Sequence, residues 1–154
     1  MSASERDVET LLPHAGNMVL IDQLQSTTDE GAEAQVKVKN PGFFSAAPDM
    51  PAWVGIEYMA QTIAAWAGYQ AFCQGEEPRI GFLIGSRKYQ SETSHFSAGS
   101  HLLVKVEKVF QDANGLASFD CVISDQSGSI LVSANLNVFQ PNDQQIQEMM
   151  EAEK

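Results

Sequence analysis

The alternation of apolar and polar residues predicts strands at both ends of the chain and one long helix between them. Residues 32–38 alternate between small apolar and charged or polar side chains, which is typical of a half-exposed strand. A short apolar run at 18–21 predicts a strand before it. Residues 51–75 are apolar almost throughout; Pro51 suits a first helical turn and Gly75 suits a helix end.

Four further runs after the helix predict strands, at 80–89, 100–110, 115–124 and 129–139. Turn signals, Asn114-Gly115 and Ser127-Gly128, separate the last three runs, so we expect an antiparallel meander. Residues 8–14 predict a short helical turn. The polar tail at 142–154 predicts a frayed helix or disorder.

This order of elements predicts an α+β fold, in which one long helix covers one face of an antiparallel sheet. We expect a single domain at 1–141, followed by the polar C-terminal tail at 142–154. A sheet on one side gives such an apolar helix little cover. A dimer that joins two sheets or buries the loop region is therefore expected.

The composition excludes several classes of function. The 154 residues carry a net charge of −11 without a basic run, which argues against nucleic-acid binding. No stretch has the length and apolarity of a membrane span, and the N-terminus lacks the pattern of a signal peptide. Cys73 and Cys121 have no metal-ligand spacing; we expect buried free thiols and a cytoplasmic protein. We expect no metal and no cofactor.

One carboxylate stands out in the predicted helix. Glu57 is the only charged residue between Asp49 and Glu76. At helical spacing it shares a stripe with Trp53 and four alanines, where we expect tight packing. A buried carboxyl group tends to have a raised pKa, which suits a general acid or base. Alternatively, Glu57 bonds a backbone N–H or Gln61 and serves only packing. Asp49 is expected to cap the helix start.

Two segments resemble those of a known enzyme family. Residues 11–14 (Leu-Leu-Pro-His) with 18–22, and Met50-Pro51 with 56–61 (Ile-Glu-Tyr-Met-Ala-Gln), are similar to the signatures of FabZ-type β-hydroxyacyl-carrier-protein dehydratases. Residues 81–84 resemble the strand that follows the helix in this family. The pattern is most similar to the ApeP-like subgroup, whose members are associated with aryl polyene lipid synthesis.

The resemblance implies a hot-dog fold, a dimer, and thioester substrates held on acyl carrier protein. It matches Glu57 to the catalytic acid of the family, which works with a loop histidine of the other subunit. Phe43 stands where that histidine is expected, and a phenyl ring cannot accept a proton. We expect His14 to replace the missing base; alternatively, His14 caps a turn or bonds a carbonyl group.

Further residues are assigned to binding. Donors at the helix start near Gly55 suit a thioester oxygen. Four aromatic residues are candidates to line an acyl pocket, although such residues are more often core: Phe43, Phe44, Trp53 and Tyr58. Positive charge gathers at Arg87 and Lys88, together with Arg79, Lys105 and Lys108. This group is either a docking patch for the carrier protein or a solvated strand end.

Three hypotheses follow for the function. The first is dehydration of 3-hydroxyacyl thioesters on acyl carrier protein, in fatty acid or aryl polyene type synthesis, with Glu57 and His14 as the catalytic pair. The second is a non-catalytic or half-catalytic subunit that completes the active site of a hot-dog partner, so the chain forms a homodimer or a heterodimer. The third is an acyl thioesterase on the same scaffold.

Overall fold

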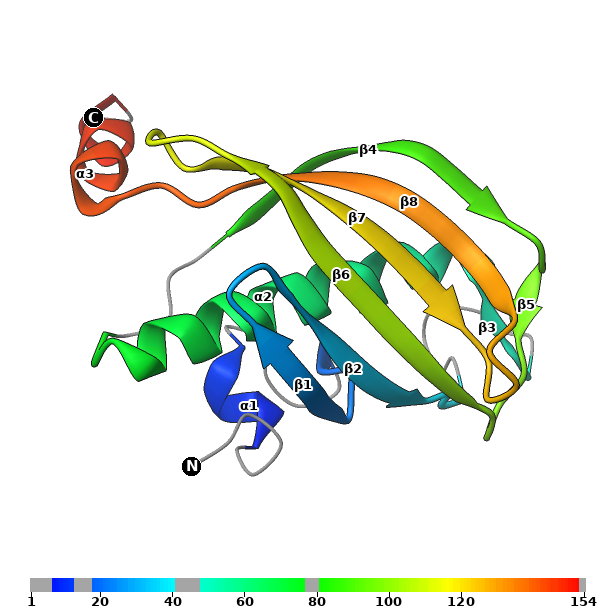
Figure 1. Cartoon of the computed structure of the whole chain (residues 1–154). Helices are drawn as coiled ribbons and strands as arrows, with labels where there is room; N and C mark the ends of the chain where they lie inside the picture. The colour runs from blue at the N-terminus through cyan, green and yellow to red at the C-terminus, as the bar shows by residue number, and fades with distance from the viewer. Residues whose placement is uncertain (1–6, 13–17, 41–47, 77–80, 153–154) are drawn as a thin grey trace.

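A curved sheet lies over one long helix in the computed structural model, which describes residues 7–12, 18–40, 48–76 and 81–152. Figure 1 shows the helix α2 (Gly55–Cys73) beneath the concave face of the sheet. The α+β fold predicted from the sequence is confirmed. The 19 residues of α2 make it the longest helix described.

The remaining elements follow in chain order. They are α1 (Val8–Leu11), β1 (Gln23–Thr28), β2 (Gly31–Lys37), β3 (Met50–Pro51), the 3-10 turn η4 (Ala52–Val54), β4 (Phe82–Ser91), β5 (His95–Phe96), β6 (His101–Gln111), β7 (Leu116–Ser124), β8 (Ile130–Phe139) and α3 (Asp143–Ala152).

Six strands form the main sheet in the order β1-β2-β6-β7-β8-β4, and each neighbouring pair is antiparallel. The predicted meander is confirmed, because β6 pairs with β7 and β7 pairs with β8. The helix α2 packs chiefly against β1, β2, β6 and β7. The other side of the sheet, β8 and the edge strand β4, arches over the helix (Figure 1), and these two strands contact α2 less than the other four do.

Main-chain hydrogen bonds stabilise the C-terminal end of α2, whereas no side chain among the described residues caps its start. At the C-terminal end, Gly75 N–H donates to Phe72 O and Glu76 N–H donates to Ala71 O, at 3.0 and 2.8 Å. Gly75 has a positive φ of 74°, so the predicted glycine cap is confirmed. The predicted cap by Asp49 is wrong, because its carboxylate accepts the N–H of Ala98 in the loop after β5 instead.

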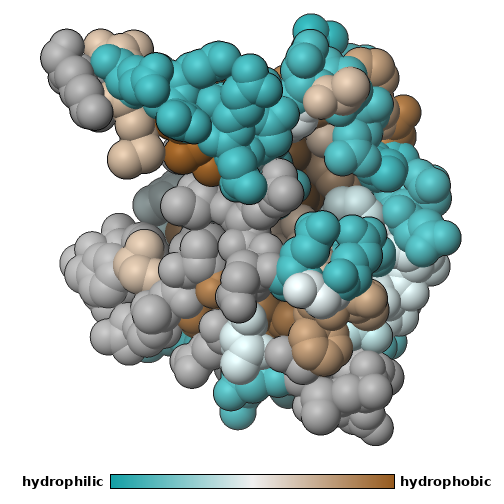
Figure 2. All heavy atoms as spheres, turned by 90° about the vertical axis from the view of Figure 1, so that its left-hand side faces the viewer, coloured by the Kyte–Doolittle hydropathy of each residue, from teal (hydrophilic) through white to brown (hydrophobic). Residues whose placement is uncertain are grey.

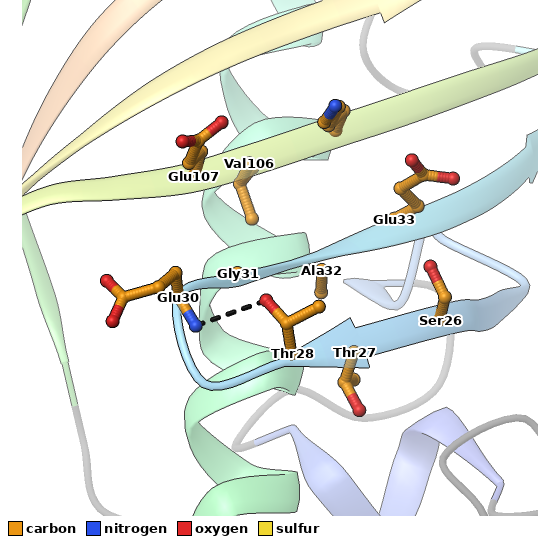
Figure 3. Close-up of a pocket in the computed structure, with 10 residues that line it drawn as sticks. Ser26, Thr27, Thr28, Glu30, Gly31, Ala32, Glu33, Val106 and Glu107 are labelled. Carbon is orange, nitrogen blue, oxygen red and sulfur yellow. Dashed lines mark hydrogen bonds between the residues drawn. The ribbon is translucent and has the colours of Figure 1, made fainter.

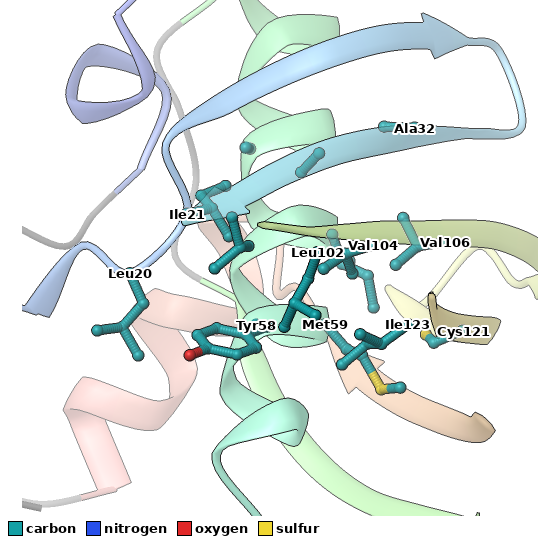
Figure 4. Close-up of a cluster of buried hydrophobic side chains, with 14 of the residues drawn as sticks. Leu20, Ile21, Ala32, Tyr58, Met59, Leu102, Val104, Val106, Cys121 and Ile123 are labelled. Carbon is teal, nitrogen blue, oxygen red and sulfur yellow. The ribbon is translucent and has the colours of Figure 1, made fainter. Parts of the chain in front are cut away.

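Apolar side chains from both layers form one core between α2 and the sheet. Figure 4 shows Tyr58 and Met59 of the helix among side chains of the strands, including Leu102 and Ile123. The fractional exposure of Tyr58, Met59 and Ile123 is 1% or less. This face of the helix is therefore filled by residues of the same chain.

The strand predicted at residues 18–21 is wrong. The N–H groups of Leu20 and Ile21 donate to the side-chain oxygen of Gln61, and not to a neighbouring strand. The first strand begins five residues after Met18, at Gln23. An apolar run alone does not distinguish a strand from a segment that is held by a buried side chain.

Two further expectations are resolved at the surface and in the core. Cys121 is buried as expected, and burial raises the pKa of its thiol to about 12, but Cys73 is exposed, which corrects the expectation of two buried thiols. The tail is expected to be either a frayed helix or disorder, and residues 143–152 form the helix α3. The side chain of Gln145 donates to Asn114 O at 2.9 Å and attaches α3 to the β6–β7 turn.

Candidate active site

Glu57 lies on a half-exposed face of α2. The predicted stripe exists, but its alanines are only half-buried, as is Glu57, and Trp53 at its start is 60% exposed. The expectation of tight packing on this face is therefore wrong. The large buried residues, such as Tyr58 and Met59, lie on the opposite face. The stripe combines small side chains with one carboxylate on a face that the described residues cover only in part.

A groove runs along this stripe, between α2 and the end of the sheet that arches over it. Its cavity measures about 220 Å³. We call it the Glu57 groove, and its lining residues are Glu57, Ala60, Ile63, Ala64, Trp66 and Ala67 of α2, with Gly81, Leu83, Gln111, Gly115, Ala117, Phe119, Val138 and Gln140 of the sheet and its turns. Most of these side chains are small or apolar. The groove therefore suits an apolar ligand chain whose reacting end lies beside the Glu57 carboxylate.

Gln61 holds the Glu57 side chain from one helical turn away. Its side-chain N–H₂ group donates to Glu57 Oε1 at 3.0 Å and to Met18 O at 2.6 Å. Its side-chain oxygen accepts the N–H groups of Leu20 and Ile21, at 2.8 and 3.4 Å. Gln61 is completely buried. The acid is thereby connected to the segment that precedes β1.

The groove continues into a second hollow toward the C-terminal end of α2. This hollow, of about 440 Å³, shares Trp66, Ala67, Gln111 and Gln140 with the groove. The Lys108 ammonium lies 5.6 Å from the centre of the Trp66 ring and donates to Gln111 Oε1 at 3.0 Å. Figure 2 views the molecule from this end, where hydrophilic residues dominate the surface and hydrophobic atoms are visible in the recesses.

Two predicted binding residues lie on the packed face of α2. Tyr58 is 1% exposed, its hydroxyl has no partner among the described residues, and burial with the negative charge of Asp22 raises its pKa above the ordinary range. The N–H of Gly55 donates to the carbonyl groups of Ala52 and Trp53 inside η4. Gly55 therefore does not offer this donor to a thioester oxygen, which corrects the sequence-based prediction.

The other predicted residues are distributed differently. Trp53 lies one helical turn before Glu57 on the same stripe, at the outer surface. His14, Phe43 and Phe44 lie outside the described residues. The structure thus places Glu57 and Trp53 on one face of the helix, while the predicted base remains a prediction from the sequence.

The positively charged residues do not form one patch. Arg87 and Lys88 are exposed on the edge strand β4, at a bulge where Lys88 has a positive φ of 54°. Lys105 and Lys108 lie on β6, and β7 and β8 separate the two strands. Arg79 of the predicted patch lies outside the described residues, and among those that the structure describes the pair on β4 remains as a local concentration of positive charge for carrier docking.

A different hollow, of about 280 Å³, lies over the β1–β2 hairpin. Figure 3 shows its lining side chains on β1, β2 and β6, with Glu30 N–H donating to Thr28 Oγ1 at 3.1 Å. It shares no lining residue with the Glu57 groove. Within the described ranges, no group of three His, Cys, Asp or Glu side chains is placed to hold a metal ion.

Comparison with known proteins identifies the family. A family model described as ApeP-like, ApeP dehydratase, matches residues 6–151. The chain belongs to the ApeP-like dehydratase family. The resemblance of the two sequence segments to this subgroup is therefore confirmed. No curated protein matches the chain.

Solved structures share the fold. The dehydratase heterocomplex ApeI:P from Xenorhabdus doucetiae contains a chain with 31% identity and a TM-score of 0.85, over 94% of this chain and 97% of that one. A hypothetical thioesterase with coenzyme A from Streptococcus pneumoniae TIGR4 has 15% identity and a TM-score of 0.61, over 78% and 85%. The E. coli PaaI protein has 13% identity and a TM-score of 0.55, over 73% and 79%.

These comparisons confirm the hot-dog fold and the dehydratase class. The two distant structures, at 15% and 13% identity, show the fold alone. None of the helices in the described parts of the chain is long and apolar enough to cross a membrane.

The sequence predicts Glu57 as a site residue, but it indicates Gln61 only as a possible packing partner of Glu57. The one signal for the role of Gln61 is that it is a second polar side chain, four residues after Glu57, in an apolar helix.

Proposed function

We propose that this ApeP-like dehydratase removes water from 3-hydroxyacyl thioesters carried on acyl carrier protein, in fatty acid or aryl polyene type synthesis, in the cytoplasm. The observation that carries the proposal is the position of Glu57 in an apolar groove lined by small residues. Such a groove accommodates an extended acyl chain beside the carboxyl group. From Glu57 to Ala67 it follows the helix for about 15 Å, since each residue rises about 1.5 Å.

Glu57 acts as the general acid in this proposal. A base removes the proton on C2, the electron pair forms the C2–C3 double bond, and the C3–O bond breaks. The protonated Glu57 carboxyl group gives its proton to the departing 3-hydroxyl, which leaves as water. The products are the enoyl thioester and water, and the proton held by the base returns to solvent or to Glu57 before the next turnover.

His14 is the base that this chain itself offers. Phe43 occupies the position of the usual loop histidine and cannot accept a proton. Only three residues separate His14 from Met18, and Met18 O is bonded to the same Gln61 side chain that holds Glu57. The connection along the chain supports His14 as the partner of Glu57.

A second arrangement has the base supplied by another hot-dog subunit. Two observations favour it: Phe43 in place of the histidine, and the heterocomplex in which the similar Xenorhabdus doucetiae chain occurs. In this arrangement Glu57 completes an active site that the partner shares. The exposed apolar side chains Leu83 and Ile84 on the edge strand β4 offer a surface for a second subunit, whether identical or different.

The carrier protein is proposed to dock at Arg87 and Lys88. This chain has a net charge of −11, so an acidic carrier is attracted only where positive charge is concentrated. The exposed Trp53, one turn before Glu57, offers an apolar surface near the acid for the arm that carries the thioester.

The experiment follows both possible products from a 3-hydroxyacyl thioester on carrier protein. The chain is assayed alone and after co-expression with its hot-dog partner. Ultraviolet absorbance of the enoyl thioester reports dehydration, and released thiol reports hydrolysis. We expect enoyl product, and we expect Glu57→Gln to lower kcat by a factor of about 10² to 10⁴, because the proton donor is lost.

The matched control is Glu148→Gln, the same substitution at an exposed residue of α3 that lines neither hollow. It should leave turnover unchanged. If the chain is active alone and His14→Ala abolishes this activity, the base comes from this chain. If the chain is active only in the complex, the site is shared with the partner. Full turnover by Glu57→Gln in both preparations, or thiol release without enoyl product, contradicts the proposal.

A further inference from the structure

Gln61 uses every hydrogen-bonding position of its side-chain amide. The oxygen accepts two N–H groups, from Leu20 and Ile21, and the N–H₂ group makes two donations, to Met18 O and Glu57 Oε1. A primary amide has two N–H donors and one oxygen with two acceptor sites. A polar side chain that is completely buried and fully bonded in this way has only one low-energy orientation.

The backbone of residues 18–21 fixes which end of the amide faces Glu57. Reversing the amide by 180° would place its N–H₂ group against the N–H groups of Leu20 and Ile21, and its oxygen against the carbonyl oxygen of Met18. Buried groups that face each other in this way lose their hydrogen bonds, at a cost of about 1–3 kcal/mol each. The N–H₂ group therefore points to the carboxyl group.

We propose that Gln61 is a positioning residue which, together with the backbone of residues 18–21, determines which oxygen of Glu57 carries the catalytic proton. The N–H₂ group donates to Oε1, so Oε1 is the carbonyl oxygen of the protonated acid and Oε2 carries the proton. This inference rests on the proposed role of Glu57 as the general acid. Oε2–H is then the group that protonates the departing 3-hydroxyl.

The same connection explains why residues 18–21 do not form a strand. Three of their backbone groups, Met18 O and the N–H groups of Leu20 and Ile21, bond to the Gln61 side chain, which lies beside the acid. The N-terminal segment thus belongs to the support of the active site, although none of its described side chains lines the Glu57 groove.

The first test variant is Gln61→Met, which keeps the length of the side chain and removes all four hydrogen bonds. We expect kcat to fall by about tenfold to a hundredfold, because a misplaced reacting group costs about this much, with KM nearly unchanged. An infrared difference spectrum against Glu57→Gln, at a pH where the carboxyl group is protonated, isolates the C=O band of Glu57. We expect this band to move to higher frequency in Gln61→Met, because Oε1 loses its donor.

The second variant, Gln61→Glu, tests the same inference if Gln61→Met fails to fold. Gln61→Glu keeps an acceptor oxygen for the N–H groups of Leu20 and Ile21, and removes the N–H₂ group that faces Glu57. Two carboxyl groups about 3 Å apart share a proton, so the acid is no longer held in one state. We expect the same fall in kcat with little change in KM.

Thr62→Val is the matched control. Thr62 is equally buried on the same helix, but its hydroxyl donates to Tyr58 O within the helix at 2.8 Å. We expect kcat within about twofold of the wild-type value. All variants are assayed in the preparation, alone or in complex, in which the wild-type chain is active.

The outcomes separate the two proposals. If Glu57→Gln is inactive while Gln61→Glu has the wild-type kcat, or if the C=O band of Glu57 does not move in folded Gln61→Met, the inference about Gln61 is overturned and the proposed function stands. If Glu57→Gln retains full turnover, the proposed function itself is contradicted.

Discussion

The two faces of α2 differ in what covers them. The face that carries Tyr58 and Met59 is filled by side chains of the sheet and is buried almost completely. The face that carries Glu57 has alanines at successive turns and borders the Glu57 groove. Both faces are apolar in sequence, yet the first stabilises the fold, while the second leaves a volume beside a carboxyl group. Substitutions on the two faces should therefore affect different measurements.

On the buried face, Met59→Ala should have the largest effect on stability. Met59 is 0% exposed among the side chains of the sheet, and truncation leaves a cavity (Figure 4). We expect the free energy of unfolding to fall by about 2–5 kcal/mol in urea titrations. Turnover per folded molecule should remain near the wild-type value.

The control for this prediction is Met150→Ala on α3, where the methionine is 62% exposed. Its effect should lie within about 0.5 kcal/mol. Equal effects of the two substitutions would contradict the contrast between packed and uncovered positions.

Gly55→Ala should have an intermediate effect. A Cβ atom at Gly55 would lie 2.5 Å from the Tyr89 hydroxyl and 3.1 Å from Ile123 Cδ1. We expect a loss of about 1–3 kcal/mol in the free energy of unfolding, because the packed side chains must move. Gly85→Ala is the matched control, since a Cβ atom there meets nothing within 4 Å. A loss at Gly85 as large as at Gly55 would show that contact at the helix start is not the cause.

Tyr89→Phe should have the smallest effect at neutral pH and a distinctive one at high pH. The Tyr89 hydroxyl donates to Ala52 O at 2.5 Å, and burial raises its pKa to about 12, above the value of 10 in the unfolded chain. Between these values the unfolded state loses the proton first, so stability should fall as pH rises from about 10 to 12.

Removal of this hydroxyl should cost about 1 kcal/mol at neutral pH. It should also make the decline of stability between pH 10 and 12 shallower than in the wild-type chain, as measured by urea titrations across that range. An unchanged slope would mean that Tyr89 does not stay protonated in the folded chain.

A helix or strand can be predicted from the sequence when neighbouring residues determine it, and not when a distant residue does. The strands β2 and β6–β8 and the helix α2 follow from alternation, turn residues and helical spacing, and the structure confirms them. The strand at residues 18–21 was wrong because Gln61, forty positions along the chain, takes the hydrogen bonds that a strand would make. A local pattern does not contain such a long-range contact.

The same limit applies to the site. An isolated charge in an apolar helix pointed to Glu57, but the small residues at its spacing predicted tight packing, whereas in the structure they border the Glu57 groove. Whether that face is packed or open depends on the curvature of the sheet, which the sequence pattern does not specify. The sequence favours Gly55 for binding because helix starts offer free N–H donors, and Tyr58 because it is aromatic, but helical geometry turns both toward the core.

The most direct test of the account compares the same substitution at two adjacent alanines. Ala64 lines the Glu57 groove, and Ala65 is 0% exposed in the core. Ala64→Leu and Ala65→Leu are each measured for stability and for kcat/KM with short and long acyl chains on carrier protein. The extra side chain is expected to obstruct the groove at one position and to overpack the core at the other.

We predict that Ala64→Leu lowers kcat/KM for long chains by about tenfold to a hundredfold, with little effect on short chains or on the free energy of unfolding. Ala65→Leu should lower the free energy of unfolding by about 1–3 kcal/mol without changing chain-length preference. If Ala64→Leu leaves long-chain turnover unchanged, the groove beside Glu57 does not hold the acyl chain.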